Sequence, residues 1–164
     1  MARYWVTGGT GNVNSTTNWS TSSGGASGAS VPTTTDDAIF DGNSGVGTVN
    51  VNATLDVLSI NFSGFNGTLG FNQTIRLNGG NITFGTGMTI TGTAGFTFLG
   101  SCTLTSNGKE IYGPLQFVIG FPSGGTLNLN GDFKCGAVLH NNMSGIVNID
   151  GSDLYIKGGA TAFT

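Results

Sequence analysis

The chain has 164 residues, including 30 Gly and 11 Phe; 37% are hydrophobic, only 8% are charged, and the formal net charge is −3. This balance excludes an intrinsically disordered chain, which combines low hydrophobicity with high charge. The few Lys and Arg residues leave no basic stripe for nucleic acid, and no apolar run is long enough to predict a membrane span, so we expect neither partner.

Residues 1–45 differ in composition from the rest and predict an N-terminal cap or docking segment. They contain both tryptophans, a small-residue tract at 20–30 and an acidic cluster, DDAIFD, at 36–41. The tract is too poor in apolar residues to pack, so we expect a surface loop there. The residues expected to form the cap or to dock onto a partner are Tyr4, Trp5, Trp19, Pro32 and Phe40.

Residues 46–164 consist of short alternating apolar and polar runs that end at Gly or Asn, which leaves no room for helices. The run TLNLNG at 126–131 recurs as IVNIDG at 146–151, and LSINF at 58–62 recurs as NITFG at 81–85. Short strands with a period of roughly 20–25 residues predict an all-β chain folded as a right-handed parallel β-helix, or β-solenoid, of about five coils.

The corners of such coils need backbone conformations with positive φ, which Gly and Asn tolerate, as at Asn130-Gly131. The same dipeptide also favours a hairpin, so an antiparallel β-sandwich or meander is the structural alternative. Outward Thr and Asn side chains should form ladders. The residues expected to point into the core include Leu127, Leu129, Phe133, Ile146, Ile149, Leu154 and Ile156.

Paired carboxylates are the strongest candidates for chemistry, because β-helix enzymes that cut polysaccharides use two or three acids on one face. Asp132 and Asp153 each follow a corner Gly, and neighbouring coils would bring them together. Asp is also a favoured turn residue, so we predict no catalytic site and no enzyme. The acids considered are Asp36, Asp37, Asp41, Asp132, Asp150 and Asp153.

The remaining candidates favour structural roles. His140, the single histidine, has no orienting carboxylate marked by spacing, and Cys102 and Cys135 lie far apart in the sequence, unlike the close pairs of zinc sites. We expect two buried thiols rather than a disulfide, and no metal or cofactor. DGNSG at 41–45 lacks the later ligands of a calcium loop and predicts a turn. The aromatics that would stack on sugars, if exposed, are Tyr4, Trp5, Trp19 and Tyr112.

The stretch 3–51, from RYWVTGG through NWS and DDAIFD to TVNV, resembles the N-terminal module of β-helical phage virion proteins: fibres, spikes and head decorations. A related pattern opens coils in autotransporter-type bacterial adhesins. One departure is Val13, where the pattern carries a second Trp. The matching residues are Tyr4, Trp5, Gly8, Gly9, Asn18, Trp19, Ser20, Pro32, Asp36, Asp37, Phe40 and Asp41.

The resemblance implies a structural or attachment role on a particle, usually as a homotrimer that contacts other virion proteins of the capsid or tail, with a host surface glycan as a further partner. MARYWVTGG lacks the apolar region of a signal peptide. This favours a virion protein assembled in the host cytoplasm over an exported adhesin. A bacterial adhesin or glycan-binding module is the second hypothesis, and a polysaccharide-degrading β-helix enzyme is the third.

Overall fold

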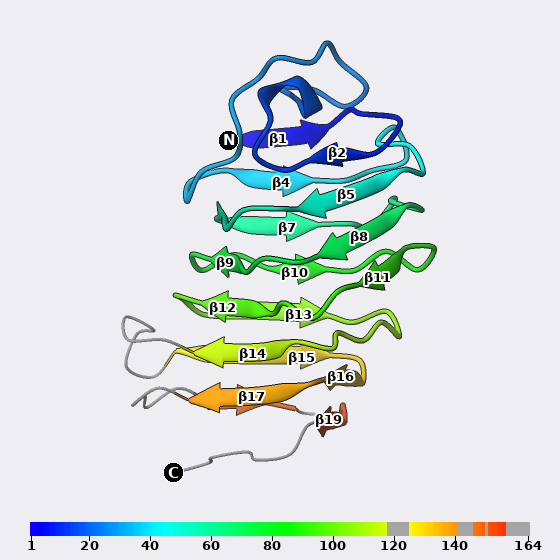
Figure 1. The fold of residues 1–164 in the computed structure, drawn as a ribbon. Coiled ribbons are helices and arrows are strands. Elements are labelled where there is room, and N and C mark those ends of the chain that lie inside the picture. Colours follow the sequence, from blue (N-terminus) through cyan, green and yellow to red (C-terminus); the bar gives the residue numbers. More distant parts are fainter. Residues whose placement is uncertain (118–124, 141–145, 150, 157–164) are drawn as a thin grey trace.

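The computed structural model describes residues 1–117, 125–140, 146–149 and 151–156 and shows a stack of parallel coils (Figure 1). Sheet A contains β1 (Ala2–Trp5), β3 (Trp19–Ser20), β4 (Asp37–Ile39), β7 (Ser59–Asn61), β10 (Ile82–Thr83), β13 (Cys102–Thr105), β15 (Thr126–Asn130) and β18 (Ile146–Asn148). Sheet B contains β2 (Gly11–Asn12), β5 (Thr48–Val51), β8 (Thr68–Phe71) and β11 (Thr89–Thr91). Sheet C contains β6 (Leu55–Val57), β9 (Ile75–Leu77), β12 (Phe96–Phe98), β14 (Pro114–Phe117) and β17 (Ala137–His140). Sheet D contains β16 (Phe133–Cys135) and β19 (Leu154–Ile156).

From β4 to β13 the chain visits the three faces in a fixed order, A then B then C, so each coil is a triangle of short strands. Sheet D takes the place of sheet B in the last coils, where β16 lies between β15 of sheet A and β17 of sheet C. The pairings between neighbouring coils are parallel; among the described strands, β1 with β3 is the one antiparallel pair. The β-solenoid prediction is confirmed, and the antiparallel sandwich or meander is wrong.

The coils stack in a nearly constant register that builds the core. On sheet A, Ala38 pairs with Ile60, Ile60 with Ile82 and Ile82 with Leu104, at the same step along the chain each time. All four side chains are buried. Directly after these strands, a second column places an aromatic ring in each coil, at Phe40, Phe62 and Phe84.

The aromatic column forms a continuous spine. Ring centroids are 4.6 Å apart for Phe40 and Phe62 and 6.2 Å apart for Phe62 and Phe84, and both pairs are stacked. The register places Ser106 at the next position of the column, and the ring of Phe133 packs 5.9 Å from Phe84. Apolar burial and ring packing therefore run along the axis of the stack, which makes neighbouring coils stabilise one another.

The N-terminal segment closes one end of the stack (Figure 1). β3 lies antiparallel along β1 with Trp5 opposite Trp19, so the edge of sheet A at this end is covered. The two indoles are buried and meet edge to face at 5.3 Å, and the Trp19 Nε1 donates to the Val13 carbonyl at 2.8 Å. Beyond Ser20, the last residue of β3, the tract at 20–30 contains no helix or strand and is mostly exposed, as predicted.

Asp36 ties the N-terminus to this end of the stack. Its buried carboxylate lies 3.3 Å from the Met1 ammonium and accepts hydrogen bonds from the Thr33 amide and hydroxyl at 3.0 and 2.7 Å. Burial alone raises the pKa of Asp36, but these partners and the charge of Arg3 outweigh it and leave the pKa lowered.

We expect Asp36→Asn to lower the free energy of unfolding by about 2 kcal/mol at neutral pH, because buried charge-assisted hydrogen bonds are lost. Since the folded-state pKa is lowered, this contribution is present above the ordinary value of 3.8 and disappears as the pH falls through the folded-state pKa. Thermal denaturation from about pH 7 to about pH 3 measures it: the wild type should converge on the variant in acid. Equal losses in Asp36→Asn and in the control Asp56→Asn, whose side chain is more exposed, would contradict the assignment.

The outer faces carry ladders of polar side chains, as expected. The Asn148 amide donates to the Asn128 side chain at 3.1 Å, and Asn52 donates to Asn14 at 3.1 Å. Each ladder joins adjacent coils and satisfies the amides without consuming core volume.

The expected core is correct for Leu127, Leu129 and Phe133, which are buried, but wrong for Ile146 and Ile149, which are 56% and 45% exposed. In β18 the register pairs Val147 with buried Leu127, so Ile146 occupies the outward position beside it. Leu154 and Ile156 are partly buried and pack against the core.

No helix in the described ranges has the length and apolarity needed to cross a bilayer.

Candidate binding groove

The acidic residues of the N-terminal segment serve local structure. The Asp37 carboxylate accepts a hydrogen bond from the Ser59 hydroxyl of the next coil, and Asp41 accepts one from the Asn43 amide at 2.9 Å. The second bond forms an Asx turn, which confirms the turn predicted at 41–45. The structure therefore does not gather these carboxylates into one site.

Cys102 and Cys135 are free and buried, as predicted. Burial raises the pKa of Cys102 to about 12 and that of Cys135 to about 11, so both thiols stay protonated and unreactive at neutral pH. His140 is the last residue of β17, and Asp150 lies outside the described residues. In the part of the chain that the structure describes, no three His, Cys, Asp or Glu side chains are arranged to hold a metal ion.

The residues expected to cap or dock lie mainly inside the N-terminal end. Trp5, Trp19, Pro32 and Phe40 are buried and Tyr4 is half-buried. The three large rings pack together, with Phe40 5.7 Å from Trp5 and 5.5 Å from Trp19. Contact between this segment and another protein stays a prediction.

The regular stacking of face B is interrupted below β11. Asn107 and Gly108 have φ values of 45° and 74°, and the Lys109 amide donates to the Ser106 carbonyl at 2.9 Å, which together make a type I′ turn. The following residues pair with the coil beyond through the Glu110–Lys134 bridge. Among the described residues, no strand pairs with β11 on this side.

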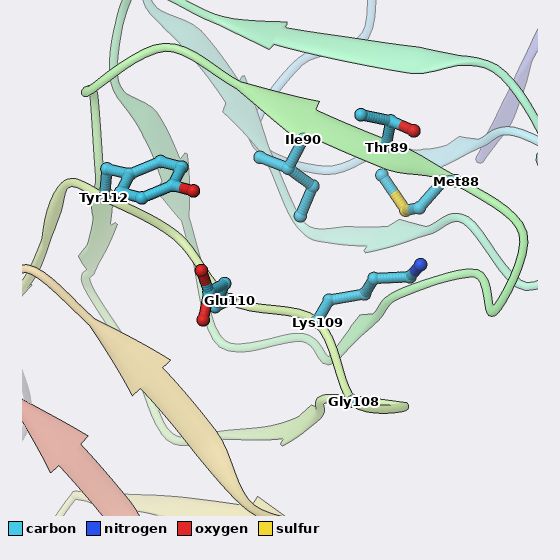
Figure 2. Close-up of a pocket in the computed structure, with 7 residues that line it drawn as sticks. All are labelled: Met88, Thr89, Ile90, Gly108, Lys109, Glu110 and Tyr112. Atoms are coloured by element: carbon cyan, nitrogen blue, oxygen red, sulfur yellow. The ribbon is translucent and has the colours of Figure 1, made fainter.

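Two adjoining hollows, of about 240 and 460 Å³, lie at this interruption and share Gly108 and Lys109. Figure 2 shows the residues that line the smaller one. We call them together the groove. It extends from β11 to β19, which is three coil steps or about 14 Å along the stack. Its lining residues are Met88, Thr89, Ile90, Gly108, Lys109, Glu110, Tyr112, Asp132, Lys134 and Tyr155.

The outward side chains change character where the groove begins. In the earlier coils of face B, the register aligns Thr48, Thr68 and Thr89 in one row. Beyond the interruption, the aligned residues are Glu110, Lys134 and Tyr155. A threonine surface thus gives way to charged and aromatic side chains on the same face.

A hydrogen-bonded chain fixes the lower part of the groove. The Asp153 amide donates to the Asp132 carboxylate at 2.9 Å, and the Tyr155 hydroxyl donates to the Asp153 carboxylate at 3.0 Å. The structure therefore brings Asp132 and Asp153 together on adjacent coils, as their spacing suggested. The hydrogen bond to Asp153 and the charge of that carboxylate raise the pKa of Tyr155, so its hydroxyl stays protonated at neutral pH.

The groove offers both ring faces and hydrogen-bonding groups. Tyr112 is 57% exposed and Tyr155 is 47% exposed, and the Lys134 ammonium lies 5.7 Å from the Tyr155 ring centroid, a cation–π contact. Carboxylates accept hydrogen bonds and ammonium groups donate them, so the groove can bind a ligand that presents both hydroxyl groups and apolar faces.

Sequence reasoning identified Tyr112, Asp132 and Asp153 but missed four other residues of this region: Lys109, Glu110, Lys134 and Tyr155. A signal was present, because Glu110 is the single glutamate of the chain and Lys109 and Lys134 belong to its small set of basic residues. The spacing from Glu110 to Lys134, and from Lys134 to Tyr155, is also one coil each time.

No protein-family model, curated protein or solved structure matches the chain.

Proposed function

We propose that this chain is a non-catalytic structural protein of a bacteriophage virion, a tail fibre or spike component or a capsid decoration, that presents a carbohydrate-binding groove to the host surface. The observation that carries the binding role is the pair of exposed tyrosines, Tyr112 and Tyr155, beside charged side chains on an otherwise threonine-lined face. The virion setting is supported by the resemblance of the stretch 3–51.

The fold suits display rather than turnover. Strands of successive coils pair in register along three faces, and the aromatic spine links the coils through the core. A stack held in this way keeps its surface side chains at fixed positions, so a ligand is met by a preformed site. Asp132 and Asp153 serve as hydrogen-bonding groups in this proposal, and Asp132 also orients the Asp153 backbone.

We expect Tyr112→Ala and Tyr155→Ala each to weaken glycan binding about tenfold or more, because a lost stacking surface removes contact area that water does not replace. Interferometry with immobilised capsular polysaccharides and lipopolysaccharides measures this. Val46→Ala is the control, since Val46 is 75% exposed and outside the groove. Wild-type protein that binds none of these glycans, or equal binding by all four proteins, would contradict the binding role.

Three further measurements test the rest of the proposal. Size-exclusion chromatography of a bound polysaccharide should show unchanged chain length; shortening that Asp132→Asn or Asp153→Asn abolishes would establish the enzyme instead. Light scattering should give three times the mass of one chain, and a stable monomer would count against a trimeric fibre. Cryo-electron microscopy of purified particles should then show symmetric copies on the capsid or tail.

A further inference from the structure

Lys109 is the central cation of the groove. It borders both hollows, is half-buried, and in Figure 2 its side chain extends below β11 towards Met88. Within the described ranges, no carboxylate lies within ion-pair distance of its ammonium; the ion pairs found there belong to Met1 and Arg76. Lys109 is therefore a groove cation whose charge no carboxylate of the described residues neutralises by direct contact.

The other charged groups near the groove have partners within the protein. Asp132 accepts the Asp153 amide, Asp153 accepts the Tyr155 hydroxyl, and Lys134 lies over the Tyr155 ring. Glu110 also has an interaction partner and shares the backbone bridge to Lys134. Among the described residues, a ligand that enters the groove would thus meet partnered acids and two ammonium groups without a carboxylate in contact. Of the two, Lys134 lies over the Tyr155 ring, and Lys109 borders both hollows.

We propose that the groove takes a glycan chain bearing an anionic substituent, such as the carboxylate of a uronic acid, and that Lys109 pairs with this group. The proposal rests on the proposed binding function and adds the charge class of the glycan. Covering a half-buried ammonium with a neutral chain removes water without replacing its interactions, whereas a carboxylate restores a charge-assisted hydrogen bond. The groove follows the solenoid axis, so the chain lies along the stack with sugar rings against Tyr112 and Tyr155.

The test compares three uronate polymers, polygalacturonate, alginate and hyaluronan, with the same polymers after reduction of their carboxyl groups. We expect at least one acidic polymer to bind the full chain tenfold or more tightly than its reduced form. Lys109→Met should remove this preference and most of the salt dependence, and Lys109→Arg should retain both. Arg76→Met, which removes a cation from sheet C, should leave binding unchanged.

The outcomes distinguish a wrong assignment of the glycan's charge from a wrong binding function. If reduced and acidic forms bind equally, or if Lys109→Met keeps the preference, the charge assignment is wrong while glycan binding stands. If dextran sulfate, a polyanion that carries sulfate esters in place of carboxylates, binds the wild type as tightly as the uronates, recognition is non-specific and the proposal fails. If neither the uronates nor any neutral glycan binds, the binding function itself fails.

Discussion

Replacing Phe84 with Ala lowers the free energy of unfolding by about 4 kcal/mol, the expected loss when a fully buried Phe leaves a cavity. Phe84 is completely buried at the centre of the aromatic spine. Its ring lies 6.2 Å from Phe62, 5.9 Å from Phe96 and 5.9 Å from Phe133. No neighbouring coil can close the cavity, because the strand pairing on both sides fixes the spacing of the coils.

Urea denaturation followed by circular dichroism measures this loss, with Val46→Ala as the control expected to stay within about 0.5 kcal/mol of the wild type. The effect should also be visible away from the substitution. Both tryptophans lie in the N-terminal end, so their fluorescence reports whether that end unfolds together with the central coils. A loss below about 1 kcal/mol would show that the ring is not packed as the structure has it.

The repeat of the fold could be predicted because the local and the long-range requirements coincide in the same residues. Asn130-Gly131 is a corner, and Gly131 has a φ of 88° that other residues rarely adopt. The residues that stack between coils, such as Phe40, Phe62 and Phe84, recur at the length of one coil. In a regular solenoid, both the corner residues and the core residues therefore recur in the sequence at the length of one coil.

The inward and outward faces of the last coil were less predictable. Ile146 and Val147 are both apolar and β-branched, so composition does not decide which one points into the core. The pairing of Val147 with Leu127 decides it, and that register is set by the length of the preceding coil. Where adjacent residues are equally apolar, the pairing with the neighbouring coil decides which side chain points into the core, and the sequence of the strand itself does not.

The groove could not be predicted because it arises from one irregular segment between sheets A and C. The segment from Leu104 to Leu115 is shorter than the equivalent segment from Ile82 to Phe96, and it contains the Asn107-Gly108 turn in place of a strand that pairs with β11. A sequence period averages over such a coil. Its consequence, the unpaired side of β11 that borders the groove, depends on the three-dimensional stacking of the coils.

Substitution of a corner glycine is the second change that we expect to lower the free energy of unfolding strongly. Gly95, Gly113 and Gly136 each precede a strand of sheet C, and none of the three has a positive φ. These positions require Gly because the neighbouring coil leaves no room for a Cβ atom. A Cβ on Gly113 would overlap the carbonyl oxygen of Ala94 in the coil before it, and one on Gly136 would overlap that of Tyr112.

We expect Gly113→Ala to lower the free energy of unfolding by about 3 kcal/mol or more, because the atoms in the way belong to the backbone and cannot rotate aside. The shift needed to admit the methyl group would stretch the hydrogen bond that the Gly136 amide donates to the Gly113 carbonyl at 3.0 Å. Gly42→Ala is the matched control: a Cβ there meets nothing within 4 Å and the φ is not positive, so its stability should stay within about 0.5 kcal/mol of the wild type. Thermal and urea denaturation of both variants measure the difference. If Gly113→Ala were as stable as Gly42→Ala, the coils would have to be further apart at this corner than parallel pairing allows, and the close stacking on which the rigid display of the groove depends would be wrong.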